Sequence, residues 1–240
     1  MASHLETKIA IVTGGSRGIG LAVTAALLDE GARVAISGLS QEHLDAAKKS
    51  LGAHADRLEA VRADVRHRAD VDRLIGAAVS RFGGVDILVN NAGIGAFANV
   101  AEMSDDDWYR VLETNLTGVF FCCNAAIPQM RTRGGGWIIN ISSLAGKNSF
   151  VGGAAYCASK AGLNAFSESL MQEVRHDDIR VSYVMPGSVA TEFSPGGSNS
   201  GTDWKLASED VAQVVMDLLA HPDRSLPSRV ELRPSRPPKK

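Results

Sequence analysis

A tyrosine and a lysine four residues apart, Tyr156 and Lys160, are the pair in this sequence best suited to proton transfer. Side chains at this spacing lie on one face of a helix. A phenol with a solution pKa of about 10 is a poor base at neutral pH, but a nearby ammonium favours the phenolate and lowers that pKa. Such a phenol can exchange a proton with a substrate oxygen. Because this spacing also arises by chance, as an exposed tyrosine beside a solvated lysine, further residues must support it.

Polar residues elsewhere in the chain can complete this pair. Ser143 stands at the end of the apolar run 137–142, and its hydroxyl can donate to the same substrate oxygen. Ser142 competes for this role, because neighbouring strand residues face opposite sides. Asn115 lies inside a long predicted helix, where asparagine is unfavourable. We expect its amide to hold a water or backbone group near Lys160. The alternative for either serine is an ordinary turn residue. The alternative for Asn115 is a buried amide whose hydrogen bonds are satisfied by backbone groups.

A glycine-rich turn follows the first apolar run of the chain. Gly14, Gly18 and Gly20 give the pattern G-x-x-x-G-x-G. Such a turn lets backbone N–H groups approach a pyrophosphate, and the following helix N-terminus favours the negative charge. A tight turn without a ligand is the alternative. Because this turn follows a strand and opens a helix, the sequence predicts dinucleotide binding.

The second predicted strand indicates which dinucleotide binds. An acidic residue about 20 residues past the glycines would hold the ribose 2′-hydroxyl of NAD. The matching stretch, 36–40, contains no acid, and Arg17 offers positive charge from the glycine turn. Arg17 as a solvated surface residue is the alternative. The sequence favours NADP(H) and leaves NAD(H) possible, so tighter binding of NADPH than of NADH is expected.

Short apolar runs alternate with longer helical patterns along the chain. Predicted strands cover 8–13, 34–37, 58–62, 87–90, 137–142, 180–185 and 229–232. Predicted helices cover 18–30, capped 41–51, 69–82, 104 towards 130, 155–175 and 208–220. This alternation predicts an α/β fold: a single Rossmann-type doubly wound domain with a mostly parallel seven-stranded sheet and helices on both faces. One domain spans 1–240, with a core at about 8–232 and a flexible tail at 234–240. Ligands of such sheets bind at the carboxyl ends of the strands, where these motifs fall.

Composition excludes several other classes of function. With 25 basic and 27 acidic side chains the net charge is −2, so neither nucleic acid nor a membrane surface is an expected partner. Cys122, Cys123 and Cys157 lack metal-ligand spacing, which predicts buried thiols in a reducing compartment and no metal. No secretory signal or membrane span is visible. These features predict a cytoplasmic protein that acts on a small molecule.

Taken together and in this order, the motifs resemble the short-chain dehydrogenases/reductases. The resemblance covers about 8–232 and rests on motifs at 13–20, Asp64-Val65, 90–93 (NNAG), Asn115, Ser143, Tyr156-x-x-x-Lys160, Pro186-Gly187 and Thr191. One departure is Leu39, since members that use NADP often carry an arginine just after the second strand.

The resemblance implies a role for each matching residue. Tyr156 would be the acid/base, Ser143 would steady the substrate oxygen, and Asn115 would support a relay water. Lys160 would also hold the nicotinamide ribose. The other cofactor-binding residues would be Gly14, Ser16, Arg17, Gly18, Ile19 and Gly20 near the pyrophosphate, Asp64 and Val65 at adenine, Asn90, Ala92 and Gly93 under the adenosine ribose, and Pro186, Gly187, Val189 and Thr191 towards the carboxamide.

Further expectations concern the substrate side and assembly. The Gly- and Ser-rich segment 191–206 is either a substrate lid or an ordinary flexible loop, and Phe193 and Trp204 are candidate substrate contacts. The resemblance implies a homotetramer (or homodimer) built on the two long helices and the last strand. The run 119–123 (VFFCC) fits such an interface, and it fits core packing equally well.

The leading hypothesis is an NADP(H)-dependent carbonyl reductase or alcohol dehydrogenase. A 3-oxoacyl-thioester reductase is one candidate, because Arg131 and Arg133 could dock an acidic carrier, although Asp177 and Asp178 argue against it. Steroid, sugar and small ketone substrates remain open. The alternative is a catalytically silent NADP(H)-binding sensor or scaffold, and the intact set of Tyr, Lys and Ser argues against that.

Overall fold

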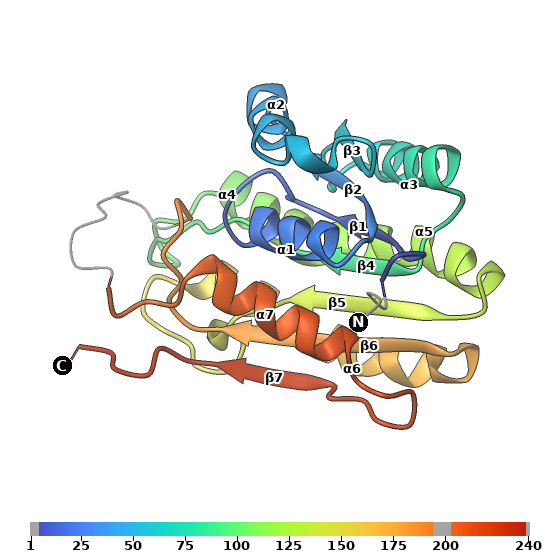
Figure 1. The fold of residues 1–240 in the computed structure, drawn as a ribbon. Helices are drawn as coiled ribbons and strands as arrows, with labels where there is room; N and C mark the ends of the chain where they lie inside the picture. The colour runs from blue at the N-terminus through green and yellow to red at the C-terminus, as the bar shows by residue number, and fades with distance from the viewer. Residues whose placement is uncertain (1–4, 194–202, 239–240) are drawn as a thin grey trace.

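Seven parallel strands form one sheet in the computed structural model, which describes residues 5–193 and 203–238 (Figure 1). The strands are β1 (Ile9–Val12), β2 (Arg33–Gly38), β3 (Leu58–Arg62), β4 (Ile87–Asn90), β5 (Gly136–Ile141), β6 (Ile179–Pro186) and β7 (Arg229–Leu232). Their order is β3-β2-β1-β4-β5-β6-β7. Every neighbouring pair is parallel, which confirms the predicted α/β fold and goes further than the expected mostly parallel sheet.

Helices connect the strands and cover both faces of the sheet (Figure 1). They are α1 (Gly18–Asp29), α2 (Gln41–Ser50), α3 (Arg68–Phe82), α4 (Asp105–Leu112), α5 (Gly118–Thr132), α6 (Ala154–Val174) and α7 (Ser208–Leu219). Ser40 and Ser104 cap α2 and α4, since their hydroxyls accept hydrogen bonds from the N–H groups of His43 and Asp107. These caps satisfy N–H groups that have no partner within the helix.

The predicted continuous helix from 104 towards 130 is wrong in one respect. A π-helical turn, Glu113–Thr117, separates α4 from α5. Such turns insert one extra residue into a helix and often occur at functional sites. Asn115 lies inside this turn, and its side chain is bonded to the backbone of Ile94 on a different loop. This long-range contact has no local sequence signal.

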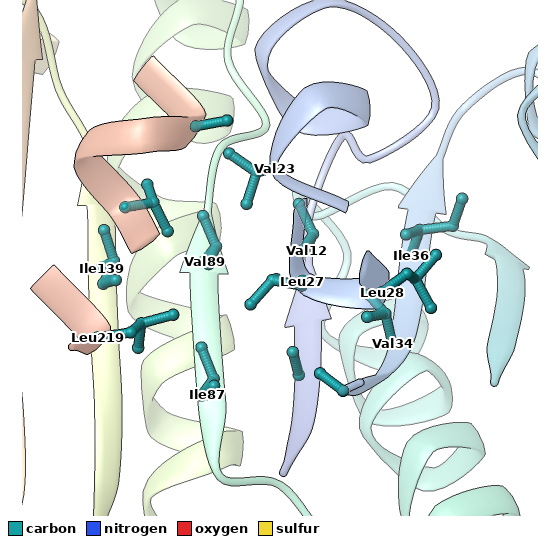
Figure 2. Packing of buried hydrophobic residues seen from close by; sticks show 14 of the residues in the cluster. Val12, Val23, Leu27, Leu28, Val34, Ile36, Ile87, Val89, Ile139 and Leu219 are labelled. Atoms are coloured by element: carbon teal, nitrogen blue, oxygen red, sulfur yellow. The ribbon is translucent and has the colours of Figure 1, made fainter. Parts of the chain in front are cut away.

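Successive strand residues divide the hydrophobic core between the two faces of the sheet. Val12 and Val89 pack against α1, α2 and α7, as Figure 2 shows for part of that cluster. Their neighbours Ile11 and Leu88 pack on the opposite face, against α3, α5 and α6. This division explains why the central strands read as unbroken apolar runs, because both faces of a parallel sheet are covered.

The strand order reverses between β1 and β4, and the loops after these two strands are tied together. Thr13 Oγ1 accepts hydrogen bonds from the N–H groups of Asn91 and Ala92, each at 3.0 Å. The Asn91 amide donates to the carbonyl oxygens of Thr13 and Gly14. A ligand crevice is expected at this reversal, beyond the carboxyl ends of the strands. The glycine turn and the NNAG segment are therefore held together at this crevice.

Part of the expected lid, 191–206, lies outside the described residues, because the structure does not describe 194–202. Leu206, the last residue of this segment, is bonded to the stretch just before it, because the N–H groups of Ala190 and Leu206 donate to the carbonyl oxygens of Leu206 and Ser188. The last two residues of the expected tail, 239–240, are also outside the described part. Within the described ranges, no helix is both long and apolar enough to span a membrane. The same ranges contain no cluster of three or more His, Cys, Asp or Glu side chains suited to a metal ion.

Candidate active site

The glycine turn has a conformation that requires its glycines. Gly14 and Gly18 have φ angles of 64° and 52°, in the left-handed region that other residues rarely adopt. A Cβ on Gly20 would lie 2.2 Å from the carbonyl oxygen of Gly14, so only glycine allows α1 to start this close to the turn. A Cβ on Gly18 would meet only the side chain of Thr191, at 3.4 Å. The turn thus leaves its backbone accessible at the N-terminus of α1, which fits a pyrophosphate.

Arg17, predicted to supply positive charge to the cofactor, forms an ion pair with Glu192. The Arg17 Nη1 and Glu192 Oε2 atoms are 2.9 Å apart, and both side chains are largely exposed. The simple interpretation of Arg17 as a solvated residue is therefore incomplete, because its charge is partly compensated. A bound phosphate would have to share Arg17 with this carboxylate.

Asp64 and Val65 follow β3, where adenine was predicted to bind. The Asp64 carboxylate accepts hydrogen bonds from the Arg66 guanidinium, with a shortest distance of 2.6 Å. Burial raises the pKa of Asp64, but these hydrogen bonds outweigh it and hold that pKa below its usual value. Val65 packs against α5, where a Cβ on Gly118 would lie 2.8 Å from Val65 Cγ2. The positions of both predicted adenine residues are therefore fixed by their neighbours.

The residues after β4 divide between the crevice and the interior. Asn90 is buried, and its amide donates to Asn140 Oδ1 at 2.8 Å and contacts Cys123 Sγ. Its Oδ1 atom has no hydrogen-bond partner within the described part of the chain. Gly93 instead lies beside Asn115 and Lys160, because a Cβ there would be 3.3 Å from Asn115 Oδ1 and 3.6 Å from Lys160 Nζ. Asn90 thus supports the loop from the protein interior, whereas Gly93, which has no side chain, leaves space next to Asn115 and Lys160.

The segment after β6 returns to the glycine turn. Pro186 ends β6, and the Gly187 N–H donates to the carbonyl oxygen of Leu232 at 2.8 Å. Val189 pairs with Leu206 in an isolated bridge, and the Thr191 side chain approaches Gly18. Thr191, predicted to hold the carboxamide, therefore lies next to Gly18, which is predicted to hold the pyrophosphate.

Lys160 is buried in the sheet–helix interface. Only 4% of its surface is exposed, and its Nζ atom donates to the carbonyl oxygen of Ile141 at 2.9 Å, at the end of β5. The same Nζ atom lies 5.8 Å from the centroid of the Tyr156 ring. Burial lowers the pKa of Lys160 to about 8, because a charged ammonium loses hydration there. The predicted pair on one face of α6 is thus present.

The expected acidification of Tyr156 does not occur in this structure. Burial raises the pKa of Tyr156, and a hydrogen bond with the Ser143 side chain only partly opposes this effect. The prediction was wrong because it considered the charge of Lys160 and ignored the loss of hydration around the phenol. Tyr156 is therefore a neutral phenol at neutral pH, the form that donates a proton.

The two competing serines separate clearly. Ser142 is buried, and its hydroxyl donates to Asn164 Oδ1 at 2.5 Å. Ser143 begins the 3-10 turn Leu144–Gly146, where its Oγ accepts a hydrogen bond from the N–H of Ala145. The strand ends at Ile141, so Ser143 belongs to the loop and its side chain reaches Tyr156. This geometry favours Ser143 as the residue beside the phenol.

Asn115 uses its whole amide to join three elements. Its Oδ1 accepts from the N–H of Ile94 at 2.9 Å, and its Nδ2 donates to the carbonyl oxygen of Ile94 at 2.9 Å and to Ser159 Oγ at 3.0 Å. Ser159 precedes Lys160 on α6. The sequence left two interpretations open for this amide: a group that acts near Lys160, or a buried amide bonded to backbone groups. The bonds to backbone groups are present, and they position the loop that carries Gly93 beside Lys160.

Phenylalanine side chains lie close to Tyr156, and only Phe193 among them was predicted from the sequence. The ring centroids of Phe97 and Phe193 lie 5.8 and 5.6 Å from that of Tyr156, and Phe150 contacts Phe97. These phenylalanines are 40–48% exposed, so they form an apolar wall next to the phenol. Trp204, the other predicted contact, is half-buried. Phe97 and Phe150 come from loops far apart in sequence, and no motif marks them.

The basic residues considered for carrier docking already have partners. Arg131 pairs with Asp177 at 2.7 Å, and Arg133 pairs with the buried carboxylate of Asp86 at 2.8 Å. Asp177 therefore compensates Arg131 directly. The predicted burial of Cys122, Cys123 and Cys157 is confirmed. Burial raises the pKa of the Cys122 thiol to about 12, so this thiol is unreactive at neutral pH.

Comparison with known proteins identifies the family. The short chain dehydrogenase family model matches residues 8–199. A 3-oxoacyl-[acyl-carrier-protein] reductase of Chlamydia pneumoniae is 38% identical over 223 residues, which cover 89% of this chain and 90% of that protein. An uncharacterized oxidoreductase of Mycobacterium bovis is 39% identical over 207 residues, covering 86% of this chain and 83% of the relative.

Solved structures agree with the sequence comparison. A metagenomic short-chain oxidoreductase in complex with NADP superimposes with a TM-score of 0.84 at 36% identity, covering 96% of this chain and 99% of that one. An actinorhodin polyketide ketoreductase with NADPH superimposes with a TM-score of 0.87 at 32% identity, covering 95% and 96%. The chain therefore belongs to the short-chain dehydrogenases/reductases, enzymes that transfer hydride between a nicotinamide cofactor and an alcohol or carbonyl group.

Proposed function

We propose that this enzyme reduces a ketone with NADPH, and that Tyr156, Lys160 and Ser143 are its catalytic residues. The observation that supports this most is that the Tyr156 phenol is hydrogen-bonded with the Ser143 side chain and its ring centroid lies 5.8 Å from the Nζ atom of the buried Lys160. This group adjoins a glycine turn whose shape fits a pyrophosphate. The relatives solved with NADP and NADPH support the choice of cofactor.

The phenol acts as the general acid in this scheme. NADPH, when bound, supplies the hydride that adds to the carbonyl carbon. The Tyr156 O–H bond then breaks, and its proton forms the new O–H bond on the carbonyl oxygen, so the products are an alcohol, NADP⁺ and a phenolate. The ammonium of Lys160 stabilises that phenolate, and the Ser143 hydroxyl orients the substrate oxygen. Because burial raises the pKa of Tyr156, the phenol carries its proton at neutral pH and is available as the general acid for reduction.

Asn115 acts as a positioning residue in the same scheme. Its amide fixes the Ile94 backbone and Ser159, the residue before Lys160. The carbonyl of Ile141 holds the ammonium on its other side. With both sides fixed, Lys160 stays close to the phenol without reorganisation during the reaction.

The phenylalanines beside Tyr156 support a ketone with an apolar substituent. Phe97, Phe150 and Phe193 present exposed ring surface next to the phenol. A substituent packed on such rings gains roughly 25 cal/mol for each Å² of apolar surface removed from water. Because Arg131 and Arg133 are already paired, they give no support to docking of an acidic carrier at that surface.

Tyr156→Phe tests the catalytic assignment. NADPH oxidation, followed by absorbance with a panel of alkyl, aryl and 3-oxoacyl thioester ketones, should fall by about 10²–10⁴-fold in the variant. The Kd of NADPH should stay within a factor of about two, because one hydroxyl is lost and the ring packing is kept. Wild-type turnover in the variant would disprove the acid role. Firm NADPH binding without turnover of any ketone would instead support the silent sensor.

Phe97→Ala tests the substrate preference. It should raise KM for aryl ketones several-fold more than KM for acetone-sized ketones, because only the larger substrates reach the ring. Phe82→Ala is the control, since Phe82 is the last residue of α3 and its ring lies beside the Arg81 guanidinium, not beside Tyr156. Equal effects of the two variants would remove the proposed apolar wall.

We also propose a homotetramer or homodimer built through α4 and α5. Trp108, Tyr109 and Phe120 are exposed on these helices, at 36%, 59% and 47%. Exposed aromatic side chains of this kind are typical of interfaces. Light scattering of the purified protein tests the assembly, and a monomeric mass would contradict it. Cytoplasmic location stays a prediction.

A further inference from the structure

Arg62, at the carboxyl end of β3, has a charge that the catalytic scheme does not use. In the register of the sheet it lies opposite Gly38, the last residue of β2. Its side chain is exposed, and its Nε atom donates to the carbonyl oxygen of Leu39 at 3.0 Å. This hydrogen bond anchors the guanidinium over the start of the loop between β2 and α2.

The side chains of Ser16 and Leu44 lie beside Gly38 at the end of β2. A Cβ on Gly38 would lie 2.9 Å from Ser16 Oγ, so the Ser16 hydroxyl stands directly beside this position. The N–H of Gly15 donates to the carbonyl oxygen of Ser37 at 3.0 Å, which joins the glycine turn to the end of β2. Ser16, Gly38 and Arg62 therefore gather at the ends of β1, β2 and β3, which are neighbours in the sheet.

The charges near Gly38 favour an anion. Within the described part of the chain, no carboxylate lies within ion-pair distance of Arg62, whereas Arg17 is paired with Glu192. The stretch 36–40 contains no acid. Arg73, which donates to the carbonyl oxygen of Arg62 at 2.7 Å, adds a second guanidinium nearby and is itself paired with Asp70. Arg62 is thus the guanidinium at this edge whose charge is not compensated by a described carboxylate.

We propose that Arg62 binds the 2′-phosphate of NADP(H), with the Ser16 hydroxyl as a second donor. The inference rests on the proposed use of NADP(H) and assigns its selectivity to a residue of β3. In doubly wound folds the adenosine ribose reaches the end of the second strand, where Gly38 leaves room. The planar fork of a guanidinium matches the geometry of a phosphate. Arg62 thereby takes the place of the arginine that members using NADP often carry just after the second strand, where this chain has Leu39.

Calorimetric titration of Arg62→Ala with NADPH and NADH tests this assignment without turnover. The Kd of NADPH should rise by about tenfold or more, because a charge-assisted hydrogen bond is lost. The Kd of NADH should not change, and that value also shows that the variant is folded. The ratio of Kd for 2′,5′-ADP to that for 5′-ADP should shift by the same factor. Arg33→Ala is the matched control, because Arg33 is an exposed arginine at the opposite end of β2.

Every outcome of these titrations either supports or contradicts the role of Arg62 in binding the 2′-phosphate. An unchanged NADPH affinity in Arg62→Ala would overturn the assignment, and so would an equal loss for NADPH and NADH, which would point to a disturbed loop. If Arg62→Ala does not fold, Arg62→Gln, which keeps a side-chain amide donor, is titrated with the same criteria. A wild-type enzyme that binds both cofactors equally would overturn the cofactor preference together with the role of Arg62. A wild-type preference that survives the substitution would overturn Arg62 alone.

Discussion

The two ends of the cofactor crevice differ in how their charged and polar side chains are held. At the catalytic end, Lys160 and Asn115 are buried, and each is bonded to a backbone group of another element. At the adenosine end, Arg17, Glu192 and Arg62 are exposed, and their contacts are ion pairs or single hydrogen bonds at the surface. The crevice is therefore rigid and poorly hydrated at one end and solvated at the other.

The difference shows which property each end controls. Electrostatic effects are strong in a poorly hydrated interior, so burial shifts the pKa of Lys160 and of Tyr156 towards their neutral forms. Exposed ion pairs contribute only about 0–1 kcal/mol, so a carboxylate there can be exchanged for a phosphate at little cost. We therefore expect substitutions at the buried end to change turnover and stability, and substitutions at the exposed end to change cofactor choice.

Lys160→Met should have the largest effect and should lower both turnover and NADPH affinity. The variant keeps most of the buried volume but removes the ammonium, so turnover should fall by about 10²–10⁴-fold. NADPH affinity should fall as well, which stopped-flow fluorescence can measure. Lys48→Met, an exposed lysine in the last turn of α2, is the control and should behave as wild type. If Lys160→Met kept its turnover, the buried end would not control the reaction.

Asn115→Ala should come next, with a loss of stability and of turnover together. The variant leaves the N–H and C=O of Ile94 without their amide partner, which should cost about 1–3 kcal/mol of unfolding free energy in urea. Turnover should fall while NADPH affinity changes little, because Lys160 loses its positioning. Asn99→Ala, at an exposed asparagine, is the control. A variant that loses stability but keeps kcat would show that Asn115 is only structural.

Gly38→Asp should change cofactor choice with little effect at the catalytic end. The new carboxylate would stand beside Ser16 and Arg62, so NADPH binding should weaken by about tenfold while NADH binding is kept or improved. Gly38→Ala separates charge from bulk, since its methyl group meets the same Ser16 Oγ without charge. If the two variants weakened NADPH binding equally, the site around Gly38 would discriminate between the cofactors by size alone.

The pH dependence of stability should show the smallest effect. The folded-state pKa of Lys160 is lowered from 10.5 to about 8, so between these values the unfolded chain binds a proton that the folded chain does not. Stability from this group therefore rises with pH from about 8 to 10.5, and below pH 8 the cost of burying the charge is fully present. Urea unfolding at pH 7.5 and 9.5 should show this rise relative to Lys160→Met. The same pH dependence in both proteins would contradict it.

Local patterns in the sequence were enough to locate most elements. The strand β3 and the helix α7 begin where predicted, because apolar periodicity, capping hydroxyls and glycines act over a few residues. The caps at Ser40 and Ser104 follow from the same local chemistry. The spacing of Tyr156 and Lys160 placed both on one face of α6, and the glycine spacing marked the cofactor turn.

Contacts between distant segments decided the rest. The sequence alone determined which side chains could react, whereas the fold decided that Ile141 holds Lys160, that Glu192 pairs with Arg17, and that Arg62 lies opposite Gly38. The direction of the Tyr156 pKa shift was also missed, because hydration depends on what packs around the phenol. Phe97 and Phe150 lie beside the active site for the same reason. Burial and partner choice arise only when the strands assemble, since they depend on groups separated by tens of residues in the chain.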